Sequence, residues 1–382
     1  MSFYNVAQPI NIAPSYGEFS VVEYLVKMPS NRQMKAGSLR VNGNLRIFKT
    51  PAVGGVPVPI DGTEGIMLDQ FTGVHSLFRN TNTTINNRTI ESLQHYSRYV
   101  SIVTQHDYTP EALITSSLCA PELKGCLNTY LLGGNSAKGI AFSMKPMIAV
   151  NKSSADLPQS RFQEIKVMFQ LGSALESLYI TGGRPVTPTI ASLSYELTDL
   201  QLSWMESPEQ PGNEPIVFNT ISNMVQTITG LNSNIQVVAS TPYDALSMSF
   251  LRQSSTKSLY INNMLSEYVP AISRVEFLVN GVDAPLSYAI TAPAYQDIAL
   301  NYFKSLGNSG SAMWGGASGM KNSIMNRFLS ENGTFGVGCA FPSSVNDKLQ
   351  VALTIDDNVS ETYNPSKNPI DCYIYTNGYL QL

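Results

Sequence analysis

The residues best suited to chemistry are the three histidines, His75, His95 and His106, which lie in or beside the stretch TINNRTIESLQHYSRY at residues 84–99. Neutral imidazoles are common ligands for zinc and copper. Spacings of 20 and 11 residues match no compact ligand motif, and the sequence has no His-x-His or His-x-x-Glu-His pattern. The histidines therefore favour structural roles, and we predict no metal site.

Other patterns that could support catalysis are equally weak. Serine is abundant, but no G-x-S-x-G turn accompanies it. The glycine-rich segment 307–319 lacks the Lys-Ser/Thr ending of a phosphate loop, so we predict a loop anchored by Trp314. Glu91, Glu164 and Glu176 are expected to be solvated or ion-paired, because nothing in the sequence brings two carboxylates together. We predict no catalytic residue, no cofactor and no enzymatic activity.

Nucleic-acid binding is also disfavoured. Tyr96, Arg98 and Tyr99 could stack on single-stranded bases, but no basic groove surrounds them in the sequence. The net charge is −4 and no run of Lys or Arg occurs, which argues against a surface that neutralises phosphates. We expect these three residues to lie in a core or an interface, and we predict no sequence-specific nucleic-acid partner.

The composition indicates extensive burial. Of the 382 residues, 43% are hydrophobic and only 14% are charged, against about a quarter in ordinary domains. Polar uncharged groups cost less to desolvate than ions. The chain is therefore expected to bury much surface, against itself or against copies, and its length is comfortable for two domains.

Two further features concern the cellular setting. The first residues lack the basic start and apolar centre of a secretory signal, and no run of 18 apolar residues predicts a membrane span. The four cysteines, Cys119, Cys126, Cys339 and Cys372, match no common zinc spacing. We expect free thiols in a reducing compartment.

Short strands separated by turn residues dominate the sequence. The runs are rich in β-branched or aromatic residues and are bounded by Gly, Pro, Asn or Ser. We predict strands at residues 21–28, 38–48, 65–69, 84–93, 98–104, 139–151, 162–171, 194–205, 234–240, 245–253, 272–290, 335–341, 348–356 and 371–377. Within 84–93, Asn86-Asn87 supplies residues that tolerate positive φ, which predicts a hairpin with Ile85 and Ile90 in the core.

Helical periodicity is scarce, and one segment reads as a linker. The best helix candidates are residues 110–119 and 294–307, the second with Gly307 as its C-terminal cap. Residues 206–215 hold three prolines and a glycine, which continue neither a sheet nor a helix. This linker falls just past the midpoint of the chain.

The two halves resemble each other in order. The hairpin sequences TTINNRTIESL and EFLVNGVDAPL place Asn86 and Asn280 at 194 residues apart, and the strand at 164–177 resembles that at 348–361 at an offset of 184. The strand near residue 200 and the C-terminal strand form a third pair. Offsets near half the chain length indicate a duplicated all-β unit of about eight strands, which is most often a jelly roll.

The order of these elements resembles a known family. The succession SLRVNGNLRI, GIMLDQFTGVHSLFRN, TINNRTIESLQHYSRYV, IAFSMKPMIAVN and FQEIKVMFQL, followed by ISRVEFLVNGVDAP, YQDIALNYFKSLG, FGVGCAFPSS and LQVALTID, is similar to double jelly-roll major capsid proteins of the tectivirus–adenovirus lineage, including virophage-like and polinton-like elements and tailless phages. The resemblance implies an all-β fold of two consecutive eight-stranded jelly rolls with a few short helices. The implied limits are an N-terminal arm at 1–20, a first jelly roll at 21–206, a linker at 207–219 and a second jelly roll at 220–382.

The same resemblance implies a function. The chain would form a homotrimer with a pseudo-hexameric outline, and the trimers would tile an icosahedral virion shell assembled in the host cytoplasm or nucleus. Its partners would be itself, minor capsid and penton proteins, and an internal membrane or a neighbouring copy contacted by the N-terminal arm. The alternative is a two-jelly-roll protein that binds or processes glycans.

Overall fold

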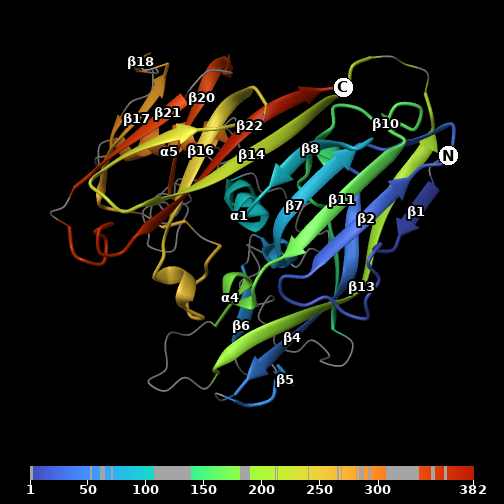
Figure 1. Cartoon of the computed structure of the whole chain (residues 1–382), viewed down its shortest axis with the longest axis horizontal. Coiled ribbons are helices and arrows are strands. Elements are labelled where there is room, and N and C mark those ends of the chain that lie inside the picture. Colours follow the sequence, from blue (N-terminus) through green and yellow to red (C-terminus); the bar gives the residue numbers. More distant parts are fainter. Residues whose placement is uncertain are drawn as a thin grey trace, which may run out of the picture.

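The protein consists of two β-rich halves that lie side by side, with helix α1 (Tyr96–His106) between them (Figure 1). The N-terminus lies at the far end of the first half, and the C-terminus lies near the junction. The computed structural model describes the chain except residues 1–2, 52–53, 61–64, 70–71, 107–138, 181–189, 211, 213, 240, 265, 268, 281, 284–287, 291–293, 307–334, 346–348 and 357–358.

Eight principal strands build the first half. They are β1 (Phe3–Ala7), β2 (Val21–Lys27), β4 (Arg40–Thr50), β7 (Phe78–Ile85), β8 (Arg88–Leu93), β9 (Ile140–Met144), β11 (Glu164–Leu171) and β13 (Ser192–Pro208). One sheet contains β1-β13-β4-β9 in that order, and the other contains β2-β11-β7-β8, all antiparallel. Counted along the chain, the orders are first-eighth-third-sixth and second-seventh-fourth-fifth. That connectivity defines a jelly roll.

The second half repeats this connectivity strand for strand. Its strands are β14 (Val217–Ile228), β15 (Asn232–Val237), β16 (Tyr243–Arg252), β17 (Ile272–Val279), β18 (Val282–Asp283), β20 (Gly336–Val345), β21 (Leu349–Ile355) and β22 (Ile370–Gln381). The sheets are ordered β14-β22-β16-β20 and β15-β21-β17-β18. The expectation of two consecutive jelly rolls is therefore confirmed, and the three sequence pairs that indicated a duplication fall on equivalent strands.

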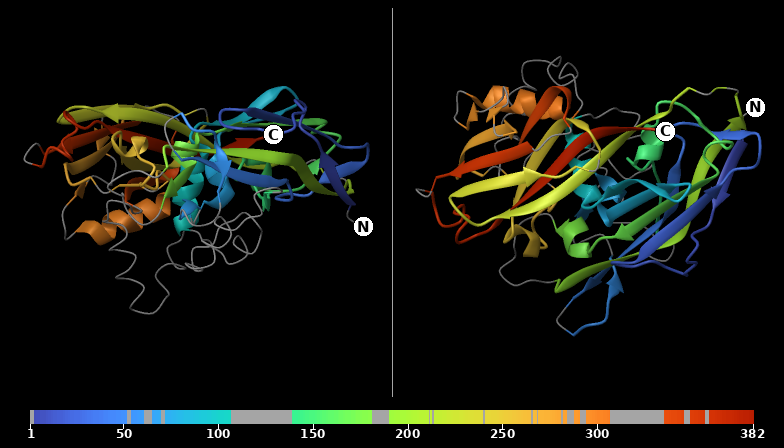
Figure 2. Two further views of the ribbon diagram at one scale, coloured as in Figure 1. Left: turned by 90° about the horizontal axis from the view of Figure 1, so that it is seen from below. Right: turned by 45° about the horizontal axis from the view of Figure 1, so that its top comes forward.

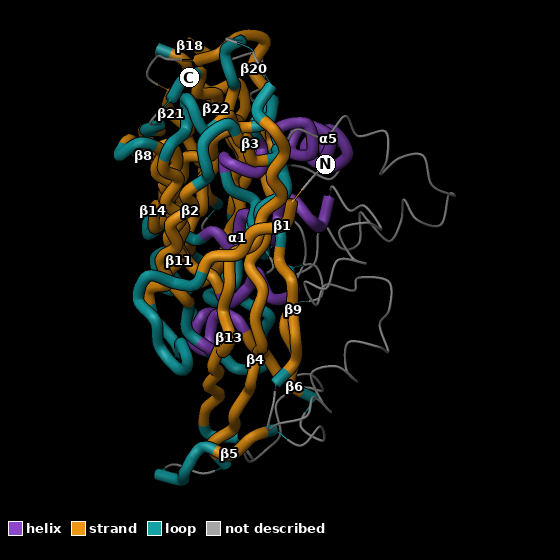
Figure 3. The backbone as a smooth tube through the Cα atoms, turned by 90° about the vertical axis from the view of Figure 1, so that its right-hand side faces the viewer, coloured by secondary structure: helices purple, strands orange, loops and turns teal. Residues whose placement is uncertain are grey.

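Short elements complete the described structure. The minor strands are β3 (Arg32–Met34), β5 (Val58–Pro59), β6 (Ile66–Leu68), β10 (Leu157–Pro158), β12 (Leu178–Ile180) and β19 (Tyr288–Ala289). The remaining helical elements are η1 (Gly73–Leu77), η2 (Ala149–Lys152), α4 (Ala174–Ser177), η3 (Ser255–Lys257) and α5 (Tyr295–Ser305). Helices α1 and α5 occupy the same place in the two halves, after the fifth strand. In Figures 2 and 3, α5 lies on one side of the strands of the second half.

Alternation of apolar and polar residues explains the strands. In β11 the residues Ile165, Val167, Phe169 and Leu171 are fully buried, while the residues between them are half-buried. Phe169 contacts Phe78 edge to face, with 5.3 Å between ring centres. The buried hydrophobic residues of both halves form one continuous core, so the two jelly rolls pack as one body.

Several local expectations differ from the structure. The strand predicted at 139–151 ends at Met144 in β9, and its last residues lie in the 3-10 helix η2. The run 98–104 was predicted to be a strand but lies in α1, because Tyr96, Tyr99 and Val100 recur at helical spacing and pack on one side. Residues 1–20 were expected to be a separate arm, whereas β1 pairs with β13 from Phe3↔Glu206 to Ala7↔Leu202. Strand β14 follows the predicted linker directly and was not predicted.

Asn42-Gly43 does not end a strand, although such a pair often forms a turn. Both residues lie inside β4, which pairs continuously there with β9. A side chain at Gly43 would come within 2.6 Å of Leu200 and 3.1 Å of Phe142. Glycine is therefore required at this position for close packing.

Candidate functional site

The stretch that contains the histidines is a hairpin followed by a helix. Strands β7 and β8 pair antiparallel, and the turn residues Asn86 and Asn87 have φ of 46° and 64°. These positive values fit a two-residue hairpin turn and confirm the prediction. Asn280, at the equivalent turn of the second half, has φ of 52°.

The described histidines have structural partners. His75 Nδ1 lies 2.8 Å from the hydroxyl of Tyr96, which accepts a hydrogen bond from the backbone N–H of Met147. His95 packs edge to face on Tyr373, with 5.1 Å between ring centres. Burial lowers the pKa of His75 to about 3. Burial and the nearby Arg98 lower the pKa of His95 to about 4. Both rings are therefore neutral at pH 7.

No metal site is found within the described part of the chain, where no three His, Cys, Asp or Glu residues are close enough to hold an ion. Cys339 and Cys372 are buried free thiols. Burial raises the pKa of Cys339 to about 12 and that of Cys372 further still, so neither is a reactive thiolate. Cys119, Cys126, the glycine-rich segment 307–319 and the helix predicted at 110–119 lie outside the described residues, as does the side chain of His106.

The two other candidate carboxylates lie apart from any reactive group. Glu164 pairs in register with Lys27 on β2, and its backbone N–H donates to the side chain of Asn86. Glu176 lies 3.9 Å from Arg79, and both side chains are about one-third exposed. These contacts fit ordinary surface roles.

Glu91 is different, because its side chain is fully buried at the junction between the jelly rolls. One carboxylate oxygen accepts a hydrogen bond from the backbone N–H of Ala149 in η2 at 2.8 Å, and the other accepts one from Ile221 in β14 at 2.8 Å. The ammonium of Lys152 lies 3.6 Å from the second oxygen. A single carboxylate thus joins three segments across the junction.

Strand β14 presents its free edge to the first jelly roll. Its other edge pairs with β22 along its whole length. The backbone N–H and C=O of Val217 bond to Ser154, and the N–H of Ile221 bonds to Glu91. An open edge can pair with other chains, so this coverage protects β14 as well as joining the halves.

Helix α1 covers a face of the second jelly roll. Tyr99 packs on Tyr375 with 5.4 Å between ring centres, and the Tyr375 hydroxyl donates to the carbonyl of His95 at 3.2 Å. The guanidinium of Arg98 lies 4.3 Å from the centre of the Tyr373 ring. Its side chain also donates to the backbone carbonyl of Asn263. The expectation that Tyr96, Arg98 and Tyr99 serve packing agrees with these contacts.

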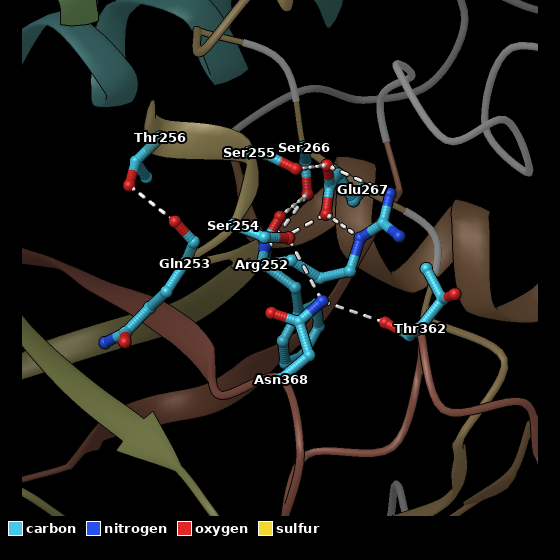
Figure 4. A network of polar contacts seen from close by, with 10 residues as sticks. Arg252, Gln253, Ser254, Ser255, Thr256, Ser266, Glu267, Thr362 and Asn368 are labelled. Carbon is cyan, nitrogen blue, oxygen red and sulfur yellow. Dashed lines mark hydrogen bonds and ion pairs between the residues drawn. The ribbon is translucent and has the colours of Figure 1, made fainter. Parts of the chain in front are cut away.

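A second buried network lies in the second jelly roll (Figure 4). The Glu267 carboxylate accepts hydrogen bonds from the Arg252 backbone at 3.0 Å, from the Arg252 guanidinium at 2.8 Å and from the Ser255 hydroxyl at 2.6 Å. Asn368 donates to Ser254 and to the carbonyl of Thr362. The network connects the end of β16 to three loops, and its geometry supports stability rather than chemistry.

Sequence reasoning did not find the junction. It expected Glu91 to be solvated or ion-paired rather than a catalytic acid or base, and it gave no role to Lys152, Ser154 or Ile221. No sequence signal marked the burial of Glu91, because it directly follows the core residue Ile90 and alternation therefore places it on the outward face. No helix in the described residues has the length and hydropathy to span a membrane.

Two jelly rolls of identical connectivity in one chain define the double jelly-roll fold. Solved structures with this fold include a structure of the Sputnik virophage, at 11% identity and a TM-score of 0.62, with 100% of this chain and 86% of that chain covered. They also include the Faustovirus major capsid protein, at 7% identity and a TM-score of 0.58, with 100% of this chain and 90% of that chain covered. The mavirus major capsid protein is similar at 12% identity and a TM-score of 0.53, with 99% of this chain and 90% of that chain covered.

No protein-family model matches the sequence, and the search of curated proteins gave no match. At identities this low, the structural likeness establishes the fold, and the resemblance in fold inferred from the order of the strands is confirmed.

Proposed function

We propose that this chain is a major capsid protein of a tailless icosahedral virus. The observation that carries the proposal is that two eight-stranded jelly rolls with the same strand order pack side by side in one chain. The Faustovirus and mavirus major capsid proteins share this fold. Its role is mechanical, and no described cluster of side chains calls for catalysis.

The repeat has a geometric use in a shell. Three copies related by a three-fold axis place six similar jelly rolls around a ring, and such a pseudo-hexameric capsomer packs on a lattice with six neighbours. The contacts at the junction keep the two jelly rolls of each chain in one orientation. We therefore infer a homotrimer that tiles the virion shell and meets minor capsid and penton proteins there.

The N-terminal segment supports contact with a second copy. Among the described residues 3–21, seven large hydrophobic side chains are exposed: Phe3, Tyr4, Val6, Ile10, Ile12, Phe19 and Val21. We call these residues the N-terminal apolar strip. Large apolar side chains exposed at this density in one segment favour an interaction site, and β1 pairs with β13 on one edge only among the described strands. We propose that a neighbouring subunit covers the strip.

The proposed division of the chain follows the same scheme. The proposed first jelly roll runs from β1 to β13, residues 3–208, and therefore extends beyond the expected limits of 21 and 206. The proposed linker spans 209–216, and the proposed second jelly roll runs from β14 to the end of the given sequence, residues 217–382. The proposed location is the capsid shell.

Analytical ultracentrifugation of the full chain at micromolar concentration tests the proposal. We expect a species of three times the 41.7 kDa chain mass, with three-fold, hexagonal-looking particles in negative stain. The variant Ile12→Asp/Phe19→Asp should weaken the trimer, whereas Val56→Asp, an exposed apolar position outside the strip, should not. A stable monomer for the unmodified chain would overturn the proposal.

A further inference from the structure

A cavity of about 470 Å³ lies along the junction of the two jelly rolls. Its wall comes from β8 of the first jelly roll and from β14, β22 and the segment between β15 and β16 of the second. Cavities of this size between domains are common ligand sites. We propose that this cavity binds a short extended peptide of a partner protein, in which a carboxylate side chain stands beside an apolar side chain.

An unsatisfied donor lies beside this site. The Asn223 side chain lines the cavity, and its Oδ1 accepts a hydrogen bond from the backbone N–H of Gln94 at 2.9 Å. Because that N–H can only donate, the contact determines which end of the amide faces Gln94. The Nδ2 group is buried and has no hydrogen-bond partner. Because this group is closed to water, a carbonyl oxygen of a bound peptide can accept from it once the amide turns toward the cavity.

The backbone of β14 offers a row of groups for an extended ligand. Val217 and Ile221 direct their backbone N–H groups toward the first jelly roll. In an antiparallel edge strand every second residue directs its backbone N–H and C=O away from the paired strand. After Val217 and Ile221, Asn223 is the next residue whose backbone groups point away from β22. It is also the β14 residue whose side chain has the free donor. A peptide can therefore pair with β14 beyond Ile221, as in strand addition to a sheet edge.

The charges at the cavity favour a carboxylate. Arg88 lines the wall, is exposed and has no ion-pair partner among the described residues. Glu91 is the one carboxylate in the wall, and its two oxygens are already occupied by Ala149, Ile221 and Lys152. The cavity thus carries one unneutralised cation, to which a carboxylate can bind through paired hydrogen bonds.

The rest of the cavity wall favours an apolar side chain next to the carboxylate residue of the peptide. Ile90, Ala239 and Leu380 line the cavity together with Val238, which is 71% exposed. Side chains on opposite faces of an extended peptide alternate. An acidic residue flanked by β-branched residues can therefore meet Arg88 with one side chain and this apolar wall with the next. The inference does not depend on the capsid role.

Fluorescence anisotropy with the labelled peptide Ac-Thr-Val-Glu-Val-Thr-amide and the full chain tests the site. We expect saturable binding, and about tenfold weaker binding of the peptide with Gln in place of Glu. The substitution Asn223→Asp keeps the acceptor for Gln94 but removes the free donor and adds a negative charge, so binding should fall by about tenfold or more. Arg88→Ala should abolish the preference for Glu over Gln.

Lys304→Ala on α5 removes a cation outside the cavity wall and should leave binding unchanged. Circular dichroism checks that each variant is folded, and if Asn223→Asp is not, the exposed position Arg88 decides the outcome. No binding at millimolar peptide, or equal binding by Arg88→Ala and the unmodified chain for both peptides, would overturn the proposal. Sedimentation of the same samples tests trimerisation separately.

Discussion

Glu91 and Ile221 form a direct hydrogen bond between the two jelly rolls, with 2.8 Å between the carboxylate oxygen and the backbone nitrogen. They are 130 residues apart in the chain. The same carboxylate binds Ala149 and lies beside Lys152, so a buried charge and the free edge of β14 stabilise each other. This contact holds the two jelly rolls in one orientation, which the proposed capsomer with six similar corners requires.

Glu91→Gln should destabilise the protein by about 2–4 kcal/mol. The amide has one oxygen for two backbone N–H donors, and it leaves the charge of Lys152 without a counter-ion. Urea unfolding followed by tyrosine fluorescence measures the change. The control is Glu196→Gln, because Glu196 pairs with Arg46 at 3.3 Å on the surface and should contribute less than about 1 kcal/mol. Equal losses in both variants would contradict a special role for the junction.

The Arg252–Glu267 pair should show strong coupling. Arg252→Met leaves Glu267 buried without its cation and should cost about 3–5 kcal/mol. The double variant Arg252→Met/Glu267→Leu removes both charges and should be more stable than Arg252→Met alone. A double-mutant cycle by chemical denaturation measures the coupling. If the double variant loses the sum of the single losses, the two residues act independently and the prediction is wrong.

Stability should fall on mild acidification. The pKa of His75 is about 3 and that of His95 about 4 in the folded chain, against about 6.5 when unfolded. Between pH 6.5 and 4 the unfolded state therefore binds more protons, so each histidine lowers stability by about 1.4 kcal/mol per pH unit as the pH falls. His75→Gln should make the dependence shallower. Denaturation midpoints at pH 7, 6 and 5 measure it, and a slope unchanged by the substitution would exclude His75 as a cause.

Among the principal strands, the sequence patterns missed β1 and β14 entirely, and they covered only the last two residues of β7. In β14 the apolar residues do not alternate with polar ones, since they stand at Val217, Phe218, Ile221, Met224, Val225 and Ile228. Val217 and Ile221 bond to the other jelly roll, and local patterns do not encode such contacts. Strands such as β11 were predictable, because apolar residues that pack on one core alternate with polar residues on the other face.

The junction was unpredictable for the same reason. Arg98 contacts the carbonyl of Asn263, and Ser101 donates to the carbonyl of Met264 at 2.8 Å, although more than 160 residues separate each pair. Backbone carbonyls carry no residue-specific signal in a sequence. The helix that presents these side chains also resembles a strand in composition, since Val100, Ile102, Val103 and Thr104 are β-branched. Tertiary packing outweighs that preference in α1.

Two glycines allow α5 to lie close to β20. A Cβ at Gly336 would overlap the ring of Tyr302 and lie 2.7 Å from the carbonyl oxygen of Met248. A Cβ at Gly338 would overlap the side chain of Ser305 and lie 2.9 Å from the carbonyl oxygen of Leu246. The two glycines are two residues apart in one strand, so they face the same side. The backbone carbonyls cannot move aside without breaking the pairing of β16 with β20.

Gly336→Ala should therefore lower stability by about 1–3 kcal/mol and displace α5. Near-ultraviolet circular dichroism reports the environment of Tyr302, and thermal unfolding reports the loss of stability. Gly230→Ala is the matched control, because nothing lies within 4 Å of a Cβ built there. That change should be neutral or slightly stabilising, since alanine restricts the unfolded chain. If both variants unfold at the same temperature as the unmodified protein, close contact between α5 and β20 is not needed for stability.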